Sequence, residues 1–458
     1  MKNSKKELFE NTPILKALLI MGVPTIISQL ITMIYNLADT YFIGQTNDPF
    51  KVAAITIVAV SYFILNSFGN LFGVGGSSLL SRLLGKKEDE EARKVGTFSF
   101  YSSLVLAIIY SLAWLIFLDP LVTLLGSTPN THEYAKSYLL WVVVIGGVPA
   151  TLGLTMSHLI RGAGYAKESG IGLAIGGITN IILDPLFMFV FLPKGNEVMG
   201  AGIATCIGNT ITFIYFLFVF YKLKDKTVLS LNVKYIKPKG ESIRLVFATG
   251  LPSCIVALLA NTTNIVKNNL ISDLGDIETA AFGITQKADM IPLNIAMGIC
   301  QGMMPLVAYN YASKDYKRMK KFISTAQIVS LIIAGIFIVV CEIFSPQIIW
   351  LFIKEEQTIN LGTKFIRIAC LTTPFIAVNV QKMYALQSMG KGKEALFLGI
   401  VRQGVFAIPS LIILTHFVGA IGVIAAPLIS DGLTFVVTTI LYKITYKKID
   451  KNIQLIEQ

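Results

Sequence analysis

Twelve long apolar segments separated by short polar loops dominate the sequence. They lie at residues 14–43, 52–81, 95–118, 134–160, 168–193, 198–221, 245–271, 279–309, 322–344, 361–388, 394–415 and 419–442. A helix needs roughly 20 apolar residues to cross the hydrocarbon core of a bilayer. Backbone groups in lipid must be satisfied internally, by helices or closed barrels, and these runs lack the alternation of barrel strands. The sequence therefore predicts an all-α integral membrane protein with twelve transmembrane helices.

The composition excludes a soluble core. Hydrophobic residues make up 54% of the chain and charged residues only 14%, whereas soluble domains carry about 25% charged residues. The net charge of +12 would suggest a nucleic-acid partner in a soluble protein. Here the basic residues fall in short loops without interleaved aromatic residues, so we expect a lipid bilayer as the partner and no nucleic acid.

The positions of the basic residues predict the orientation in the membrane. If the N-terminus, with Lys2, Lys5 and Lys6, is cytoplasmic, the cytoplasmic segments hold 28 Lys and Arg residues and the opposite segments hold five. Cytoplasmic loops of membrane proteins carry such an excess of Lys and Arg. We therefore expect a multi-pass protein of the cytoplasmic (inner) membrane with both termini in the cytoplasm.

The two halves of the chain are weakly similar to each other. A shift of 228 residues places Gly22-Val23-Pro24 on Gly250-Leu251-Pro252 and Asn36 on Asn264. We expect an N-terminal six-helix bundle at 1–221, a basic cytoplasmic linker at 222–243 and a C-terminal six-helix bundle at 244–458. The even number of spans per half makes the repeat parallel and the two bundles pseudo-symmetric. Transporters built this way work by alternating access, with substrate at the interface between the halves.

Polar residues inside the N-terminal spans predict an ion-binding site. Asn36 and Asp39 are three residues apart, and Asn180 and Asp184 are four apart, so each pair lies on one helical face. The direction of each span places Asp39, Asp184 and Thr205 in the outer half of the bilayer, where they can converge on one chamber. A charge in a span is costly and usually functional. Such a cluster binds a proton or, through Asp39, Asn180, Asp184 and Thr205, a Na⁺ ion. The alternative is that these groups only hydrogen-bond the helices together.

The C-terminal spans carry charges of both signs. The candidates for substrate contact or for charge pairing are Lys287, Asp289, Arg402 and Asp431. The spacing of Lys287 and Asp289 points the two side chains to different sides of their helix, while Arg402 and Asp431 are candidates to pair with each other. Ion pairs within the bundle are an equally good explanation of all four. Glu342, Arg367 and Lys382 are expected near helix ends, where long side chains reach the interface.

No pattern in the sequence predicts an enzyme or a bound cofactor. The glycine-rich run Gly73-Val74-Gly75-Gly76 lacks the Lys and Ser or Thr of a phosphate-binding loop. A nucleophile with a base, or a cluster of metal ligands, is not visible either. We therefore expect transport driven by an ion gradient rather than by ATP.

With these residues identified, the chain resembles the MATE (multidrug and toxic compound extrusion) family over nearly its whole length, in particular the DinF and MepA branch. The motifs that carry the resemblance are Asn36-Leu37-Ala38-Asp39-Thr40-Tyr41-Phe42-Ile43-Gly44, Ser81-Arg82-Leu83-Leu84-Gly85, Arg161-Gly162-Ala163-Gly164 and Asn180-Ile181-Ile182-Leu183-Asp184-Pro185. The resemblance implies two six-helix bundles around a central cleft. It also implies a coupling site at Asp39, Asn180, Asp184 and Thr205. The NorM-like branch of the family instead uses acidic residues in the seventh and tenth helices. The polar residues of these helices in this chain are Asn264, Lys267, Gln381 and Lys382, and none of the four is acidic.

The expected function is secondary active efflux of multiple drugs. The protein would export organic, often aromatic and cationic, compounds in exchange for H⁺ or Na⁺, and it would work as a monomer without a cofactor. The alternative is a flippase for lipid-linked oligosaccharides, which shares the broad fold. A long basic groove and additional helices would favour that alternative, whereas a carboxylate cluster favours the antiporter.

Overall fold

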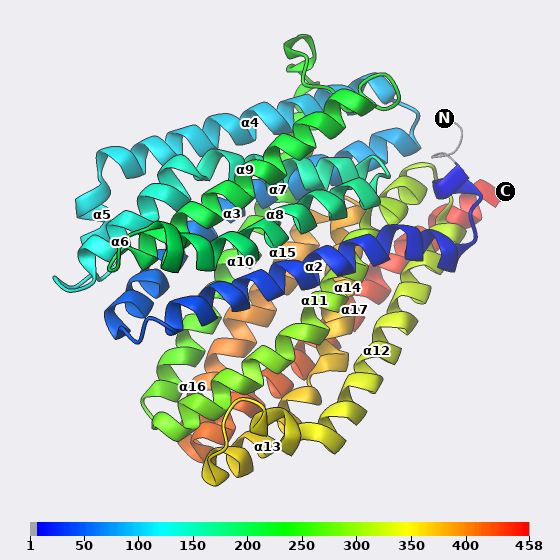
Figure 1. Ribbon diagram of the computed structural model, residues 1–458. Coiled ribbons are helices and arrows are strands. Elements are labelled where there is room, and N and C mark those ends of the chain that lie inside the picture. Colours follow the sequence, from blue (N-terminus) through cyan, green and yellow to red (C-terminus); the bar gives the residue numbers. More distant parts are fainter. Residues whose placement is uncertain (1–6, 458) are drawn as a thin grey trace.

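The computed structural model describes residues 7–457 and confirms an all-helical protein with two lobes (Figure 1). Within this range no strand is present. Eleven helices are long and apolar enough to cross a membrane, and the bent pair His132–Ile145 and Gly147–Gly162 makes a twelfth span if it is counted as one. Lys2, Lys5 and Lys6, which contribute to the expected orientation, lie outside the described residues.

Each lobe is a bundle of consecutive helices. The N-terminal lobe contains α2 (Ile14–Gly44), α3 (Pro49–Gly85), α4 (Asp89–Ile116), α5 (Leu118–Leu124), α6 (His132–Leu139), α7 (Gly147–Gly162), α8 (Ala166–Leu186) and α9 (Glu197–Leu223). The C-terminal lobe contains α10 (Gly240–Ser272), α11 (Asp276–Ala312), α12 (Tyr316–Trp350), α13 (Glu356–Cys370), α14 (Thr373–Ser388), α15 (Gly392–Ile400), α16 (Ile408–Val418) and α17 (Ala420–Glu457). Both termini lie at the same end of the molecule, and the lobes diverge away from that end (Figure 1).

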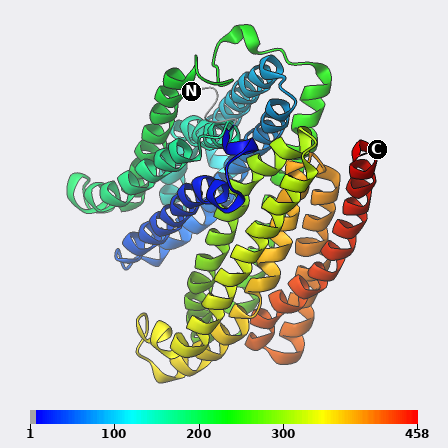
Figure 2. The same ribbon diagram turned by 90° about the vertical axis from the view of Figure 1, so that its right-hand side faces the viewer.

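The segment 224–239 joins the two lobes at the end that carries the termini (Figure 2). It contains one short 3₁₀ turn, Val233–Tyr235, and it is attached to α4 by hydrogen bonds to its backbone. The Tyr101 hydroxyl donates to the carbonyl of Leu231 at 2.8 Å, and Thr97 Oγ1 donates to the carbonyl of Ser230 at 3.0 Å. The connection is therefore held against the N-terminal lobe.

Three π-helical segments interrupt the regular helices. They are Leu140–Ile145 after α6, Phe187–Phe191 after α8 and Val401–Ala407 after α15. The first is followed by Gly146, where the span bends by 49°. Such wide turns are rare and are frequent at functional sites. Tyr138 and Asp184 lie shortly before the first two segments, and Arg402 lies within the third.

The lobes touch through closely packed backbone near the end that carries the termini. A Cβ atom added to Gly250 of α10 would lie 1.9 Å from the carbonyl oxygen of Leu71 in α3. A Cβ on Gly75 would lie 2.3 Å from the carbonyl oxygen of Val246. Small residues allow membrane helices to approach this closely. We call this region, where α3 meets α10 and α2 meets α11, the sealed end.

Polar side chains reinforce the sealed end. Arg161 at the end of α7 is 3% exposed, and its Nη1 donates to Gln301 Oε1 of α11 at 2.7 Å. Ser78 Oγ of α3 donates to the carbonyl of Gln387 in α14 at 2.8 Å. Two of the sequence motifs also meet here, because Ser81 Oγ donates to the carbonyl of Gly162 at 2.8 Å. The bonds of Arg161 and Ser78 join the two lobes, and the bond of Ser81 fixes α3 against α7 within the N-terminal lobe.

We expect Arg161→Ala to lower the free energy of unfolding by about 1.5–3 kcal/mol, the usual contribution of a hydrogen bond to a charged group. The substitution removes the bond from one lobe to the other and leaves Gln301 with one partner fewer. Thermal unfolding of the detergent-solubilised protein measures the effect. Arg367→Ala is the control, because Arg367 is exposed and its partner Glu342, at 3.5 Å, forms a surface pair of about 0–1 kcal/mol. Equal destabilisation by both variants would contradict the prediction.

The residues ahead of α2 rest on the C-terminal lobe, although they precede a helix of the N-terminal lobe. We call residues 7–13 the N-terminal strap. Phe9 is 3% exposed and stacks on Tyr309 with ring centroids 4.7 Å apart. Arg318 Nε donates to the carbonyl of Phe9 at 2.7 Å, and Arg318 Nη2 donates to that of Thr12. The strap therefore links the two lobes at the sealed end.

Candidate functional site

A buried polar cluster lies in the N-terminal lobe, in the part of the bundle remote from the termini. Asn180 and Asp184 occupy one face of α8 and are 3% and 0% exposed, respectively. Asn180 Nδ2 donates to Asp184 Oδ1 at 3.2 Å and to Thr205 Oγ1 of α9 at 3.2 Å. The structure therefore brings together three of the side chains that the sequence selected.

Asp39 of α2 lies close enough to Asp184 for the two carboxylates to interact electrostatically. Within residues 7–457 neither carboxylate forms an ion pair with a Lys, Arg or His side chain. Three buried oxygens of the cluster have no hydrogen-bond partner among the described residues: Asp39 Oδ1, Asn180 Oδ1 and Asp184 Oδ2. Buried acceptors without partners are costly, and a proton or a small hard cation satisfies such acceptors. The oxygens fit a Na⁺ ion in kind, since hard cations prefer oxygen ligands.

Tyrosine and amide side chains surround the cluster, and the sequence analysis missed them. Tyr35 of α2 and Tyr62 of α3 interact electrostatically with Asp39 and with each other. Asn209 Nδ2 of α9 donates to the Tyr62 hydroxyl at 3.3 Å. Tyr138 of α6 lies beside Thr205. The cluster therefore draws on five helices of the lobe and is supplied with hydroxyl groups that can relay a proton.

Asn36 does not join this cluster. Its side chain is exposed, and its backbone carbonyl accepts a hydrogen bond from Thr40 Oγ1 at 3.0 Å. The expectation that Asn36 adds an oxygen to the site is therefore not supported by its position.

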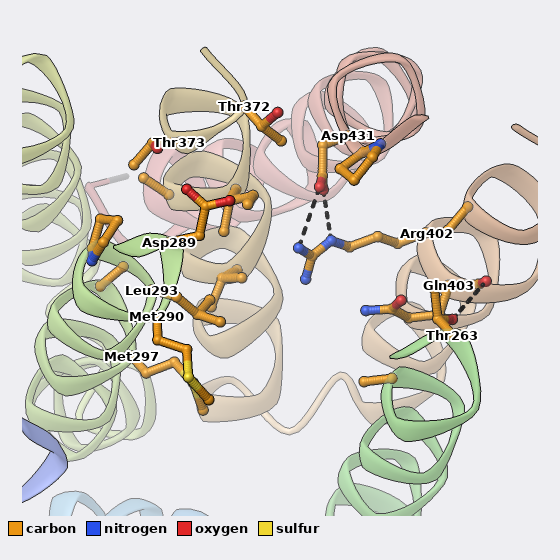
Figure 3. Close-up of a pocket in the computed structure, with 18 of the residues that line it drawn as sticks. Thr263, Asp289, Met290, Leu293, Met297, Thr372, Thr373, Arg402, Gln403 and Asp431 are labelled. Carbon is orange, nitrogen blue, oxygen red and sulfur yellow. Dashed lines mark hydrogen bonds and ion pairs between the residues drawn. The ribbon is translucent and has the colours of Figure 1, made fainter. Parts of the chain in front are cut away.

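A cavity of about 430 Å³ lies mainly in the C-terminal lobe, and Asn70 and Val74 of α3 also line it. Its wall includes Asp289 of α11, Arg402 of the π-helical segment and Asp431 of α17 (Figure 3). Arg402 Nε donates to Asp431 Oδ1 at 2.6 Å, and Asn379 Nδ2 donates to the same oxygen at 3.2 Å. The candidate pair of the sequence analysis is thus formed, at the edge of a cavity large enough for a small organic molecule.

Lys287 and Asp289 point to different sides of α11, as their spacing indicates. Asp289 lines the cavity, whereas Lys287 is exposed and lies over the ring of Phe352, 5.8 Å from its centroid. Lys267 of α10, which stands in the seventh span where a NorM-like site would need an acidic residue, also lines the cavity. The cavity therefore contains two cationic and two acidic side chains, and Lys287 is not among them.

Lys382 is not at a helix end, so the expectation for this residue was wrong. It lies inside α14 and is 7% exposed. Its Nζ donates to Thr439 Oγ1 at 3.2 Å and lies 5.4 and 5.5 Å from the ring centroids of Phe435 and Tyr442. Aromatic faces stabilise a desolvated ammonium group, which explains how the lysine is accommodated inside the bundle.

The pair of Arg402 and Asp431 supports a prediction about stability. Asp431 is only 4% exposed, and breaking a buried ion pair by removing one partner costs about 3–5 kcal/mol. We expect Arg402→Gln and Asp431→Asn each to destabilise the protein to that extent, and the double variant to cost less than the two single changes together. Thermal unfolding of the three variants measures the coupling. Strict additivity would show that the two groups do not depend on each other.

Comparison with known proteins places the chain in a family. The family model MatE matches residues 24–186 and again residues 252–413, two matches that begin 228 residues apart and so confirm the internal repeat. The multidrug export protein MepA of Staphylococcus aureus (strain MRSA252) is 32% identical over 437 residues, with 94% of each chain covered. MepA of Staphylococcus saprophyticus is 28% identical over 431 residues, again with 94% of each chain covered.

Solved structures agree with the fold. A multidrug resistance MATE family transporter of the MOP superfamily in an outward-facing conformation superposes with a TM-score of 0.89 at 21% identity, covering 97% of this chain and 98% of the other. A MOP superfamily transporter from Pyrococcus furiosus, whose binding pocket is described as reversed in polarity, gives a TM-score of 0.88 at 21% identity with the same coverage. The two matches of the family model, the full-length similarity to MepA and the two-lobed helical fold agree, and the chain therefore belongs to the MATE family of transporters and is not an enzyme.

Proposed function

We propose that this protein is a secondary active multidrug exporter that exchanges organic, often aromatic and cationic, compounds for H⁺ or Na⁺ by alternating access. The observation that carries the proposal is the set of buried, partnerless oxygens of Asp39, Asn180 and Asp184 in the N-terminal lobe. Two carboxylates without a basic partner are costly inside a membrane protein unless an ion neutralises them. A site of this kind exchanges its ion with the solvent when the lobes rearrange.

The coupling follows from the charge of the cluster. With a proton or a Na⁺ ion bound, the charge of Asp39 and Asp184 is partly neutralised and the buried state becomes less costly. With the ion released, the two carboxylates repel each other. The helices that carry them then favour an arrangement in which the two groups are farther apart or better hydrated. Exchange with the drug arises if the loaded and empty forms prefer different arrangements of the lobes, because a ligand shifts an equilibrium only by its differential affinity.

The orientation and location are part of the proposal. The excess of Lys and Arg in alternate loops supports cytoplasmic termini in the inner membrane, and the sealed end is then cytoplasmic. The lobes diverge towards the opposite side, so this conformation would be open to the exterior. We further propose that the monomer is the functional unit, because each lobe carries its own polar site, and that no nucleic acid is bound.

The relatives support the drug exporter over the flippase. The S. aureus and S. saprophyticus proteins are named for multidrug export, and the similarity extends along almost the whole chain. In the cavity described above, acidic and basic side chains are balanced, whereas a carrier of lipid-linked oligosaccharides calls for a long basic groove. The flippase alternative is therefore not favoured.

The test is efflux of a fluorescent cationic dye from proteoliposomes of the purified protein. One set of vesicles receives a pH gradient, a second a sodium gradient, and a third both ions at equal concentration on the two sides. We expect dye movement with at least one gradient and none in the third set. Protein-free vesicles control for passive leakage of the dye. Dye movement that is the same in all three sets would overturn the proposal of ion-driven exchange.

A further inference from the structure

The cavity of the C-terminal lobe contains two charged groups of opposite sign that remain unpaired. Arg402 and Asp431 neutralise each other at 2.6 Å. Lys267 and Asp289 line the same cavity and interact with each other electrostatically, and Lys267 interacts more strongly with Asp431 and Arg402 of the neighbouring bridge. Neither forms an ion pair within residues 7–457. The cavity therefore offers one free ammonium and one free carboxylate that are too far apart to satisfy each other.

The remaining wall is suited to an aromatic or otherwise apolar body. Met290, Leu293 and Met297 project along one side of α11, in the direction of the cavity that Asp289 also lines (Figure 3). Methionine side chains are flexible and polarizable and make favourable contacts with aromatic rings. On the other side, Thr263 and Gln403 are tied to each other, since Thr263 Oγ1 donates to the carbonyl of Gln403 at 3.3 Å. The volume of about 430 Å³ matches a compound of drug-like size.

A compound with a single positive charge satisfies only half of this site. Its cation can pair with Asp289, but Lys267 then gains no counter-ion from the ligand and repels it. Buried charges are tolerated when they are paired and hydrogen-bonded. A ligand with both an ammonium and a carboxylate group pairs with both residues and leaves the Arg402–Asp431 bridge intact.

We propose that the C-terminal cavity binds zwitterionic aromatic compounds, with Asp289 pairing with the ligand's ammonium group and Lys267 with its carboxylate. This inference rests on the proposed export function and names a substrate class for it. It also assigns a different ligand to each lobe. The N-terminal cluster, which has carboxylates without basic partners, takes the coupling ion, and the C-terminal cavity, with balanced charges, takes the substrate.

Binding of three matched fluorescent probes to the purified protein in detergent tests the inference. Dansylcadaverine carries only an amine, Nε-dansyl-lysine carries an amine and a carboxylate, and dansyl-aminocaproate carries only a carboxylate. Fluorescence anisotropy gives a dissociation constant for each. We expect the wild-type protein to bind Nε-dansyl-lysine more tightly than the other two. Equal or tighter binding of dansylcadaverine, or no binding of any probe, would overturn the proposal.

Variants of the two free charges separate their roles. Lys267→Gln should weaken binding of Nε-dansyl-lysine by roughly tenfold to a hundredfold, as expected for the loss of a hydrogen bond to a charged group. The same variant should tighten binding of dansylcadaverine, because the ammonium of Lys267 no longer repels the amine of this probe. Asp289→Asn should weaken both amine-bearing probes. Lys267→Arg retains the positive charge and should restore binding of Nε-dansyl-lysine. Lys287→Gln is the matched control, because this lysine sits two residues from Asp289 but outside the cavity, and all three affinities should be unchanged.

The outcomes distinguish this inference from the proposed function. Binding is measured without any gradient, so selective loss in Lys267→Gln supports the substrate class even if gradient-driven export fails. Conversely, dye export by the wild-type protein stands if Lys267→Gln affects no probe or weakens all three equally. Either of those two results means that Lys267 does not recognise the carboxylate, and the proposal is wrong.

Discussion

Asp184→Asn is expected to reduce ion-driven export to the leak rate of protein-free liposomes. The amide has nearly the shape of the carboxylic acid, so the hydrogen bond from Asn180 to Oδ1 has a counterpart in the variant. It cannot release a proton or supply a negative charge to Na⁺, however, so the cluster loses the charge change on which coupling depends. Export from proteoliposomes under each gradient measures the effect. Binding of the transported compound to the detergent-solubilised variant, measured without a gradient, should persist.

Asp119→Asn is the control for that result. Asp119 belongs to the same lobe but lies on the surface, with Lys136 at 2.7 Å and His132 at 3.2 Å. The hydrogen bond from Lys136 holds the pKa of Asp119 below its ordinary value, so the carboxylate is ionised at neutral pH and the substitution removes a full charge. Export should be retained in this variant. Normal export by Asp184→Asn under either gradient would show that Asp184 is not part of the coupling site.

Gly250→Val is expected to abolish export by preventing the lobes from meeting at the sealed end. The nearest atoms to an added Cβ all belong to Leu71 of the other lobe, the first being its carbonyl oxygen at 1.9 Å. Backbone cannot move aside as a flexible side chain can, so the lobes have to separate. The helices within each lobe keep their own contacts, and we expect the variant to fold but to remain open at this end. Alternating access, which needs both arrangements, is then lost.

Two measurements check the Gly250 prediction. Export should fall to the background rate, and the buried thiol of Cys254, one turn from Gly250 in α10, should become reactive towards maleimide, as identified by mass spectrometry of the labelled peptide. Gly283→Val serves as the control, since the same substitution in α11 meets no atom within 4 Å. Full export by Gly250→Val would mean that the close backbone contact is not required in the transport cycle.

The sequence was sufficient to predict the spans, because hydropathy reports directly on the lipid environment. The first span was expected at 14–43 and is Ile14–Gly44. The fourth was expected as one helix at 134–160, but the structure breaks it at Gly146. Hydropathy averages over side chains and does not register a π-helical turn in Leu140–Ile145, where every residue is apolar. Local backbone geometry was therefore the part of the fold that the pattern could not provide.

The candidate coupling site was recovered only in part, and the reason lies in the type of residue searched for. Asp39 and Asp184 stand out because a charge in lipid needs an explanation. Tyr35, Tyr62 and Asn209 are uncharged, so the search for charges in lipid does not select them. Helical spacing was the available signal, because Tyr35 lies four residues before Asp39 and Asn209 four after Thr205, which puts each on the face of a selected residue. In contrast, Asn36 was chosen by the same rule at three residues and is exposed.

In the C-terminal lobe, sequence reasoning identified the charged residues but not their environment. Which of Lys287 and Asp289 faces the cavity depends on how α11 packs, and a spacing of two residues says only that they differ. Lys382 was misjudged because its partners, Phe435 and Tyr442 of α17, lie more than fifty residues away in the chain. Contacts between distant helices are set by the packing of the whole lobe.

The N-terminal strap makes the two lobes unequal partners when the sealed end separates. α2 moves with one lobe, while Phe9 ahead of it is stacked on Tyr309 of the other. A rigid-body rotation that parts the lobes must therefore unstack this ring, or unwind the first turn of α2 so that the strap stays behind. In both cases a segment of seven residues contributes to the energy barrier of the return step. The rate of turnover then depends on residues that touch neither the drug nor the coupling ion.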